Sequence, residues 1–174
     1  MIPFPDPPLR GEGFVLRVWT DADTAAYKAA MQDAENRRWL NEYDENAAEI
    51  DAVRVAGQML ALTIADAGSD AFLGFVALLM KEQRVGELAY MVVPAARGRG
   101  LAPAAVRLVG GWAFATLELP RLQLRIDPAN AASIRVAERC GYRFEGVLRS
   151  VFELRGTRID SAMYSRLPTD PPPV

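Results

Sequence analysis

A short basic loop, Arg97-Gly98-Arg99-Gly100, lies between an apolar run and a helical pattern. The apolar run extends from Leu88 to Val93 and stops at Pro94. Glycine allows the backbone to approach a ligand closely, and the free N–H groups and positive dipole end of a helix favour an anion. The residues therefore predict a phosphate-binding turn. An ordinary strand-to-helix turn is the alternative, but it does not need glycines interleaved with arginines.

The residue types available for proton transfer are restricted. The chain has no histidine, which excludes histidine-containing triads and histidine metal sites and leaves carboxylates, hydroxyls and tyrosines. We expect no metal. The one cysteine, Cys140, cannot form an intramolecular disulfide and indicates a reducing compartment. It falls at an expected helix C-terminus, where the dipole disfavours a thiolate, so we interpret it as buried and structural.

Composition limits the partners and the location. The 174 residues, 51% of them hydrophobic, suit one globular domain. A formal net charge of −2 argues against general binding to nucleic acid or a membrane surface. No apolar run is long enough to span a membrane, and prolines stand where a secretion signal would place apolar residues. We expect a cytoplasmic monomer or homodimer.

The elements that hold the loop follow from periodicity, cap residues and turn signals. Strands are expected over 14–18, 60–65, 71–80, 85–93, 121–126, 142–154 and 158–166. Helices are expected over 22–31 with a possible extension to 39, then over 47–59, 101–116 and 131–139. This order, β-α-α-β-β-β-α-β-α-β-β, predicts an α/β (α+β) fold with a mixed sheet and helices on its faces.

Local signals support several of these boundaries. Thr20 with Asp23 resembles a capping box, and Asn130 is a cap for the last helix. The helix over 101–116 is expected to bury a stripe of Leu101, Ala105, Leu108, Trp112 and Ala115. Residues 1–10 form a predicted proline-rich arm, 11–167 the domain and 168–174 a proline-rich tail.

Two blocks of the sequence resemble the GNAT acetyltransferases. The loop fits the family's acetyl-CoA signature, Arg/Gln-x-x-Gly-x-Gly/Ala, through Arg97, Gly100 and Ala102. The segment from Asn130 and Ser133 to Gly146 resembles the family's second block. Within the family, the Asn-x-x-Ser pair is most similar to the branch that acetylates ribosomal-protein N-termini. The resemblance implies the GNAT fold and transfer of an acetyl group from acetyl-CoA to a primary amine.

The resemblance also implies which residues bind the donor. Backbone N–H groups of the loop would wrap the pyrophosphate, and a bulge in the preceding strand would free backbone groups for the pantetheine arm and the acetyl carbonyl. The implied donor-binding residues are Met91, Val92, Val93, Arg97, Gly98, Arg99, Gly100, Leu101, Ala102, Asn130 and Ser133.

An amine must lose its proton to attack, and free amines have pKa values of about 8 to 10.4. Glu87 matches the position of a glutamate that is the general base in several family members. Glu153 and Asp160 are the reserve candidates. The alternative for Glu87 is a solvent-facing strand residue or a salt-bridge partner of an arginine.

Many family members protonate the leaving thiolate with a tyrosine, but Ala137 stands at that position. Ser133 is the implied substitute, as a hydrogen-bond donor or relay. The alternative is a first-turn serine that bonds the backbone near Asn130.

The acceptor pocket is expected beside Trp39 and Tyr43, where an acidic and aromatic connection would suit a cationic amine. A plain solvated loop is the alternative. The acceptor is either a protein N-terminus or a small molecule. Two other functions stay open, an acyl-CoA-binding module with little catalysis and a nucleotide-phosphate binder. The latter is opposed by the lack of Gly-Lys-Ser/Thr after the loop.

Overall fold

The computed structural model describes residues 2–40 and 57–173. Its strands are β1 (Arg10–Gly11), β2 (Phe14–Val18), β3 (Met59–Asp66), β4 (Phe72–Met80), β5 (Val85–Val92), β6 (Arg121–Ile126), β7 (Arg143–Leu154) and β8 (Thr157–Arg166). Its helices are α1 (Asp21–Ala30), α2 (Ala34–Trp39), α4 (Leu101–Leu117) and α5 (Ala131–Arg139). No described helix is long and apolar enough to cross a membrane.

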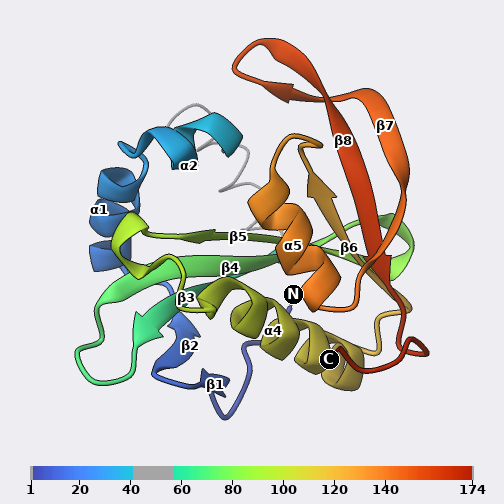
Figure 1. Ribbon diagram of the computed structural model, residues 1–174. Coiled ribbons are helices and arrows are strands. Elements are labelled where there is room, and N and C mark those ends of the chain that lie inside the picture. The colour runs from blue at the N-terminus through green and yellow to red at the C-terminus, as the bar shows by residue number, and fades with distance from the viewer. Residues whose placement is uncertain (1, 41–56, 174) are drawn as a thin grey trace.

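All eight strands form one sheet in the order β1-β2-β3-β4-β5-β6-β8-β7. Neighbouring strands are antiparallel except β5 and β6, which are parallel. In Figure 1, β7 and β8 rise as a long hairpin away from the half of the sheet that contains β3, β4 and β5. The mixed α/β fold expected from the sequence is confirmed.

The helix predicted over 22–31 corresponds to α1, but its possible extension to 39 is a separate helix, α2. The chain leaves α1 after Ala30, and the Asp33 side chain then accepts a hydrogen bond from Asn36 N over 3.0 Å, which caps a new helix. The predicted helix over 47–59 falls mainly outside the described residues. Its last three residues were placed wrongly, because 57 and 58 are not helical and Met59 begins β3, where it pairs with Leu79.

Asp23, in the first turn of α1, ties that helix to the sheet. Its Oδ2 accepts hydrogen bonds from Thr20 N (2.7 Å), Thr63 Oγ1 in β3 (2.9 Å) and Arg17 in β2 (2.7 Å). Burial raises the cost of ionising this carboxyl, but the bonds from Arg17, Thr20 and Thr63 outweigh it and lower the pKa of Asp23 to about 2. The predicted capping box is therefore one part of a larger polar network.

The helices cover the two faces of the sheet. On one face, Met91 of β5 packs with Tyr27, Ala30 and Met31 from the end of α1. On the other face, Leu88 joins the main core beside α4 and α5 (Figure 1). The buried residues of α4 are Leu101, Ala105, Val106, Val109, Gly110 and Ala113.

The stripe predicted for α4 was therefore partly wrong. Leu101 and Ala105 are buried, but Leu108 and Trp112 are only half-buried and Ala115 is exposed. The helix is apolar over most of its circumference, so its sequence pattern does not mark the inner face.

The parallel pair β5–β6 separates soon after it begins. Only three residue pairs join the strands, Val85 with Arg121, Gly86 with Leu122 and Glu87 with Gln123. Beyond them β6 turns away from β5, as Figure 1 shows. The bulge expected in β5 is absent, since its ladder with β4 continues in register from Met80↔Gly86 to Gly74↔Val92. The separation comes from the divergence of β6.

Candidate active site

A cleft of about 1370 Å³ lies where β5 and β6 separate. It brings together most residues predicted for donor binding, Met91, Val92, Arg97, Gly98, Gly100, Leu101, Ala102, Asn130 and Ser133. Glu87 and Trp39 also line it. Val93 and Arg99 are not among the described lining residues, and Tyr43 lies outside the described part of the chain.

The glycine loop has the backbone conformation that its sequence predicts. Gly98 and Gly100 adopt left-handed φ values of 78° and 75°, and Gly100 is the N-cap of α4. A Cβ added at either glycine would meet nothing within 4 Å, so the backbone faces open space there. Open N–H groups at the start of a 17-residue helix suit a phosphate group of the donor.

The two arginine side chains of the loop point to carboxylates. Arg97 forms an ion pair with Asp33 and also donates to Asn36 Oδ1 over 2.8 Å. Arg99 lies 3.9 Å from Asp66, at the end of β3. The loop therefore offers the cleft its backbone, while Arg97 connects it to α2.

The β5 backbone is open on the side of β6. Val93 N donates to Leu73 O on the β4 side over 2.9 Å. Because backbone direction alternates along a strand, the N–H and C=O groups of Leu88, Tyr90 and Val92 face β6. The last ladder pair, Glu87 with Gln123, still engages the Leu88 N–H. Beyond it β6 provides no ladder partner for Tyr90 and Val92 within the described residues, so these groups can bond an extended ligand such as a pantetheine arm.

Ser133 is held from two directions. Asn130 caps α5 by accepting a hydrogen bond from Ser133 N over 3.0 Å, which confirms the predicted cap. Tyr90, on β5, donates its hydroxyl to Ser133 Oγ over 3.0 Å. The serine hydroxyl thus meets a tyrosine from the sheet.

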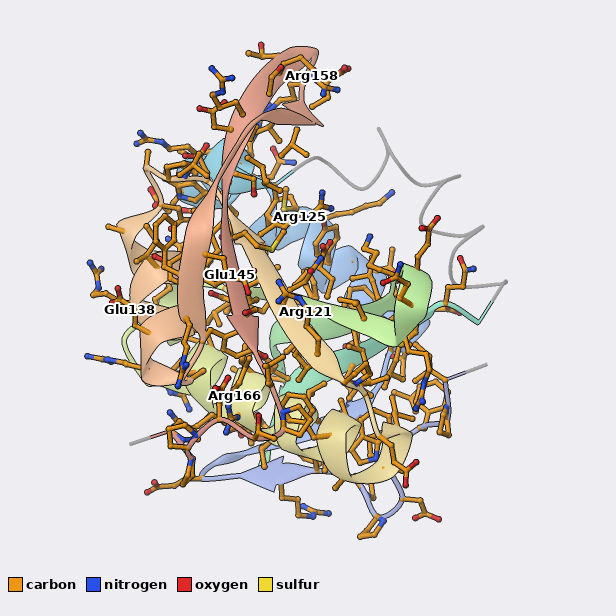
Figure 2. All side chains as sticks on the ribbon, turned by 90° about the vertical axis from the view of Figure 1, so that its right-hand side faces the viewer. Arg121, Arg125, Glu138, Glu145, Arg158 and Arg166 are labelled. Carbon is orange, nitrogen blue, oxygen red and sulfur yellow. The ribbon has the colours of Figure 1, made fainter. Side chains whose placement is uncertain are left out.

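Glu87 is enclosed by donors. Its side chain accepts hydrogen bonds from Gln123 Nε2 (2.8 Å) and Arg125 (2.9 Å), and Lys81 Nζ lies 3.4 Å away. Figure 2 shows Arg125 on β6, further along the strand than Arg121. The residue is only 7% exposed, so it is an ion-paired carboxylate at the inner end of the cleft. The arginine partner expected as an alternative is present.

The reserve carboxylates lie at the hairpin end of the cleft. Both Glu153 and Asp160 line it, and Asp160 Oδ1 accepts a hydrogen bond from Ser150 N over 2.8 Å. Across the cleft, Trp39 Nε1 donates to Glu35 Oε1 over 2.8 Å. Trp39 and Glu35 thus form one polar contact at the cleft wall on α2, while the rest of the predicted acidic and aromatic connection lies outside the described residues.

Cys140 is buried at the C-cap of α5, with its sulfur 3.4 Å from Pro103 O. Burial raises the pKa of its thiol to about 11, although Arg107 and Arg166 act in the opposite direction. A neutral buried thiol is a poor nucleophile, which supports the interpretation of Cys140 as structural. Across residues 2–40 and 57–173, no group of three or more acidic or cysteine side chains is arranged to hold a metal ion.

Comparison with known proteins agrees with this geometry. The acetyltransferase (GNAT) domain family matches residues 14–143. Because this match covers most of the chain, the protein belongs to the GNAT acetyltransferase family.

Relatives found by sequence comparison share about a third of the aligned residues with this chain. YjcK of Bacillus subtilis, described as a probable N-acetyltransferase, is 34% identical over 83 residues, which are 48% of this chain and 46% of YjcK. The match thus spans about half of that relative's length. Spermidine N(1)-acetyltransferase of Escherichia coli is 32% identical over 73 residues, covering 42% of this chain and 39% of the relative.

Solved structures share the fold over almost the whole chain. Mycobacterium smegmatis RimJ in complex with CoA-disulfide has a TM-score of 0.77 at 24% identity, over 92% of this chain and 86% of that one. Spermidine N-acetyltransferase from Vibrio cholerae, in complex with CoA and spermine, has a TM-score of 0.77 at 18% identity, over 92% and 98%. At these identities the likeness establishes the fold alone.

Two parts of the site were missed from the sequence. Tyr90 lies inside the apolar run of β5, and its side chain points to the opposite face of the sheet from that of Glu87. Only its hydroxyl distinguished it from the apolar residues around it. Asp33 and Asn36 form a helix-cap signal. It was overlooked because extending the predicted helix to 39 places both residues in the helix interior. The partners of all three are distant in sequence, and no local pattern indicates them.

Proposed function

We propose that this protein transfers an acetyl group from acetyl-CoA to a primary amine, on a protein N-terminus or a small molecule. The observation that carries the proposal is the single cleft formed by the glycine loop, the open edge of β5 and the first turn of α5. Acetyl-CoA supplies a thioester whose carbonyl carbon accepts the amine nitrogen. The cytoplasm, inferred from the single buried cysteine, is part of the proposal.

The donor-binding roles divide between loop and strand. Backbone N–H groups from Gly98 to Ala102 would hold the pyrophosphate at the positive end of α4. The open backbone groups of Tyr90 and Val92 would pair with the pantetheine arm and polarise the acetyl carbonyl. Asn130 would hold α5 against the donor.

Glu87 is the proposed base, directly or through water. Its carboxylate lines the cleft and contacts Arg125 and Lys81, which orient it there. Ser133 is the proposed hydrogen-bond donor to the departing sulfur. A thiol of pKa about 8.5 is a good leaving group, so a hydrogen bond is sufficient help.

The acceptor is proposed to enter between α2 and the β7–β8 hairpin. Trp39 and Glu35 line one wall there, and Glu153 and Asp160 line the other. These carboxylates suit a cationic amine. A relative named for spermidine acetylation, and similar folds named as ribosomal-protein acetyltransferases from Vibrio cholerae and Vibrio fischeri, make polyamines and protein N-termini the first classes to test.

The test is release of free CoA from acetyl-CoA in the presence of an amine panel. The panel should contain polyamines, amino acids, aminoglycosides and short peptides with free N-termini. We expect at least one class to give saturable turnover and an acetylated product by mass spectrometry. Binding of acetyl-CoA without turnover of any amine would contradict the proposal.

An acyl-CoA-binding module is the second candidate. It is favoured by the ion pairing of the Glu87 carboxylate and by alanine at 137. A module of this kind would bind acetyl-CoA with wild-type affinity in the Glu87→Gln variant and show no turnover in either form. Competition of acetyl-CoA with ATP or NAD in a thermal-shift assay addresses the nucleotide-binding alternative.

A further inference from the structure

Tyr90 connects the open edge of β5 to the first turn of α5. Its hydroxyl donates to Ser133 Oγ over 3.0 Å and also lies 3.4 Å from the Ser133 carbonyl oxygen. Both residues line the cleft. The contact therefore lies inside the proposed site and joins residues from two separate elements.

The distances favour one arrangement of the hydrogens at this contact, with the shorter contact as the hydrogen bond. Burial raises the pKa of Tyr90 to about 12, more than the bond to Ser133 lowers it, so its phenol is protonated at neutral pH. A serine hydroxyl has two acceptor lone pairs and one hydrogen. Since Tyr90 donates to Ser133 Oγ, the hydrogen of Ser133 does not point back along that line. The backbone N–H of Ser133 is already bonded to Asn130.

Building on the acetyl transfer proposed above, we infer that Tyr90 is a positioning residue for the leaving group. By donating to Ser133 Oγ, it leaves the Ser133 hydroxyl hydrogen directed into the cleft, as the donor to sulfur. In the reaction, the N–C bond forms, the C–S bond breaks and the amine proton passes to Glu87. The sulfur departs as a thiolate that accepts the Ser133 hydrogen bond.

Tyr90 and Ser133 both keep their protons in this scheme. Full transfer from a phenol of pKa about 12 to a thiolate of pKa about 8.5 would be uphill, so the pair acts by hydrogen bonding. The polarised donor is stronger than an isolated serine, because hydrogen bonds in a chain reinforce one another. A tyrosine hydroxyl thus reaches the site from β5, although α5 carries alanine at 137.

The chain offers a matched control for removal of the hydroxyl. Tyr142 is also a buried tyrosine, and its hydroxyl has no hydrogen-bond partner among the described residues. Among the described residues that line the cleft, Tyr142 is absent. Tyr142→Phe therefore removes an equivalent atom without breaking a bond, whereas Tyr90→Phe keeps the ring and loses the contact with Ser133.

The first measurement needs no acceptor. Calorimetry compares the affinity for CoA and for desulfo-CoA, which lacks the thiol, at pH 7 and pH 9. Wild type should prefer CoA by about tenfold at pH 9, where the thiol is largely ionised and accepts a charged hydrogen bond. Tyr90→Phe and Ser133→Ala should each bring the ratio close to one, and Tyr142→Phe should retain it.

The second measurement uses turnover with the best amine of the panel. Tyr90→Phe should lower kcat about tenfold with little change in the KM for acetyl-CoA, and Ser133→Ala should lower it at least as much. The double variant should match Ser133→Ala, since Tyr90 acts through the serine. Thermal melting of each variant checks that the fold is retained.

The outcomes separate the two proposals. Turnover in wild type with an unchanged CoA preference and kcat in Tyr90→Phe overturns the role of Tyr90 and leaves the acetyltransferase function intact. A Tyr90-dependent CoA preference without turnover of any amine supports the positioning and rejects the acetyl transfer. Absence of CoA binding rejects both. If Tyr90→Phe does not fold, the preference of Ser133→Ala for CoA over desulfo-CoA decides. An unchanged preference in that variant would show that Ser133 does not bond the sulfur, so Tyr90 would have no donor to position.

Discussion

Arg97, in the glycine loop, is ion-paired with Asp33, the N-cap of α2. The pair joins the loop that would hold the donor to α2, which lines the proposed acceptor entrance. The hydrogen bond from Arg97 lowers the pKa of Asp33, so the carboxylate is charged at neutral pH. A negative charge therefore lies next to the proposed phosphate site.

Asp33→Asn should tighten acetyl-CoA binding about twofold to fivefold, because a repulsive charge is removed and Arg97 is released. Asparagine also caps helices, so α2 should persist. Calorimetry at low and high salt measures the effect, which should shrink as salt rises. Glu12→Gln, in the exposed β1–β2 turn, is the charge-matched control. Weaker binding in Asp33→Asn would show that the ion pair orients the loop for its ligand.

Glu87→Gln should lower kcat/KM about a hundredfold if the carboxylate is the base. It should also lower the free energy of unfolding by about 1–3 kcal/mol, because Arg125 and Lys81 lose a charged partner. Arg125→Gln separates the two effects, since it breaks the same ion pair and keeps the carboxylate. We expect Arg125→Gln to retain more than a tenth of the turnover. Equal losses in the two variants would assign Glu87 a structural role.

The Asp23 network should make stability depend on acid pH. The pKa of Asp23 is about 2 in the folded protein and near 3.8 when unfolded, so its contribution is present above the unfolded value. It is lost as the pH falls from about 4 to 2, and amounts to about 2 kcal/mol at neutral pH. Urea unfolding should show Asp23→Asn destabilised at pH 7 but close to wild type at pH 2. Asp21→Asn, exposed in the same helix turn, should differ little from wild type at either pH.

Gly74→Ala tests the rigidity of the open strand. Gly74 has a φ of 154°, and a Cβ there would lie 2.1 Å from the Met91 carbonyl oxygen. The substitution should cost about 2–4 kcal/mol of stability and displace β5, weakening acetyl-CoA binding. Chemical unfolding and calorimetry measure the two effects. Gly111→Ala, in α4 with nothing within 4 Å of its Cβ, should be neutral or slightly stabilising.

Much of the site could be predicted because its signals are local. The left-handed glycines of the loop and the Asn130 cap depend on residues within a few positions of each other. The contacts of Ser133 with Tyr90 and of Arg97 with Asp33 join positions far apart in the sequence, and only the packed sheet brings them together. The divergence of β6 was mistaken for a bulge in β5, because strand pairing leaves no mark in the sequence of one strand.

The early separation of β5 from β6 has a consequence for how this protein can diversify. The groups that we propose it offers to the donor belong to the main chain, which every amino acid carries. Under the proposed function, substitutions along β5 and the cleft walls can therefore alter the choice of amine while the backbone contacts to the thioester are kept. Side chains that contact the acceptor can therefore be exchanged one at a time, because the main-chain groups proposed to bind the donor do not change with them.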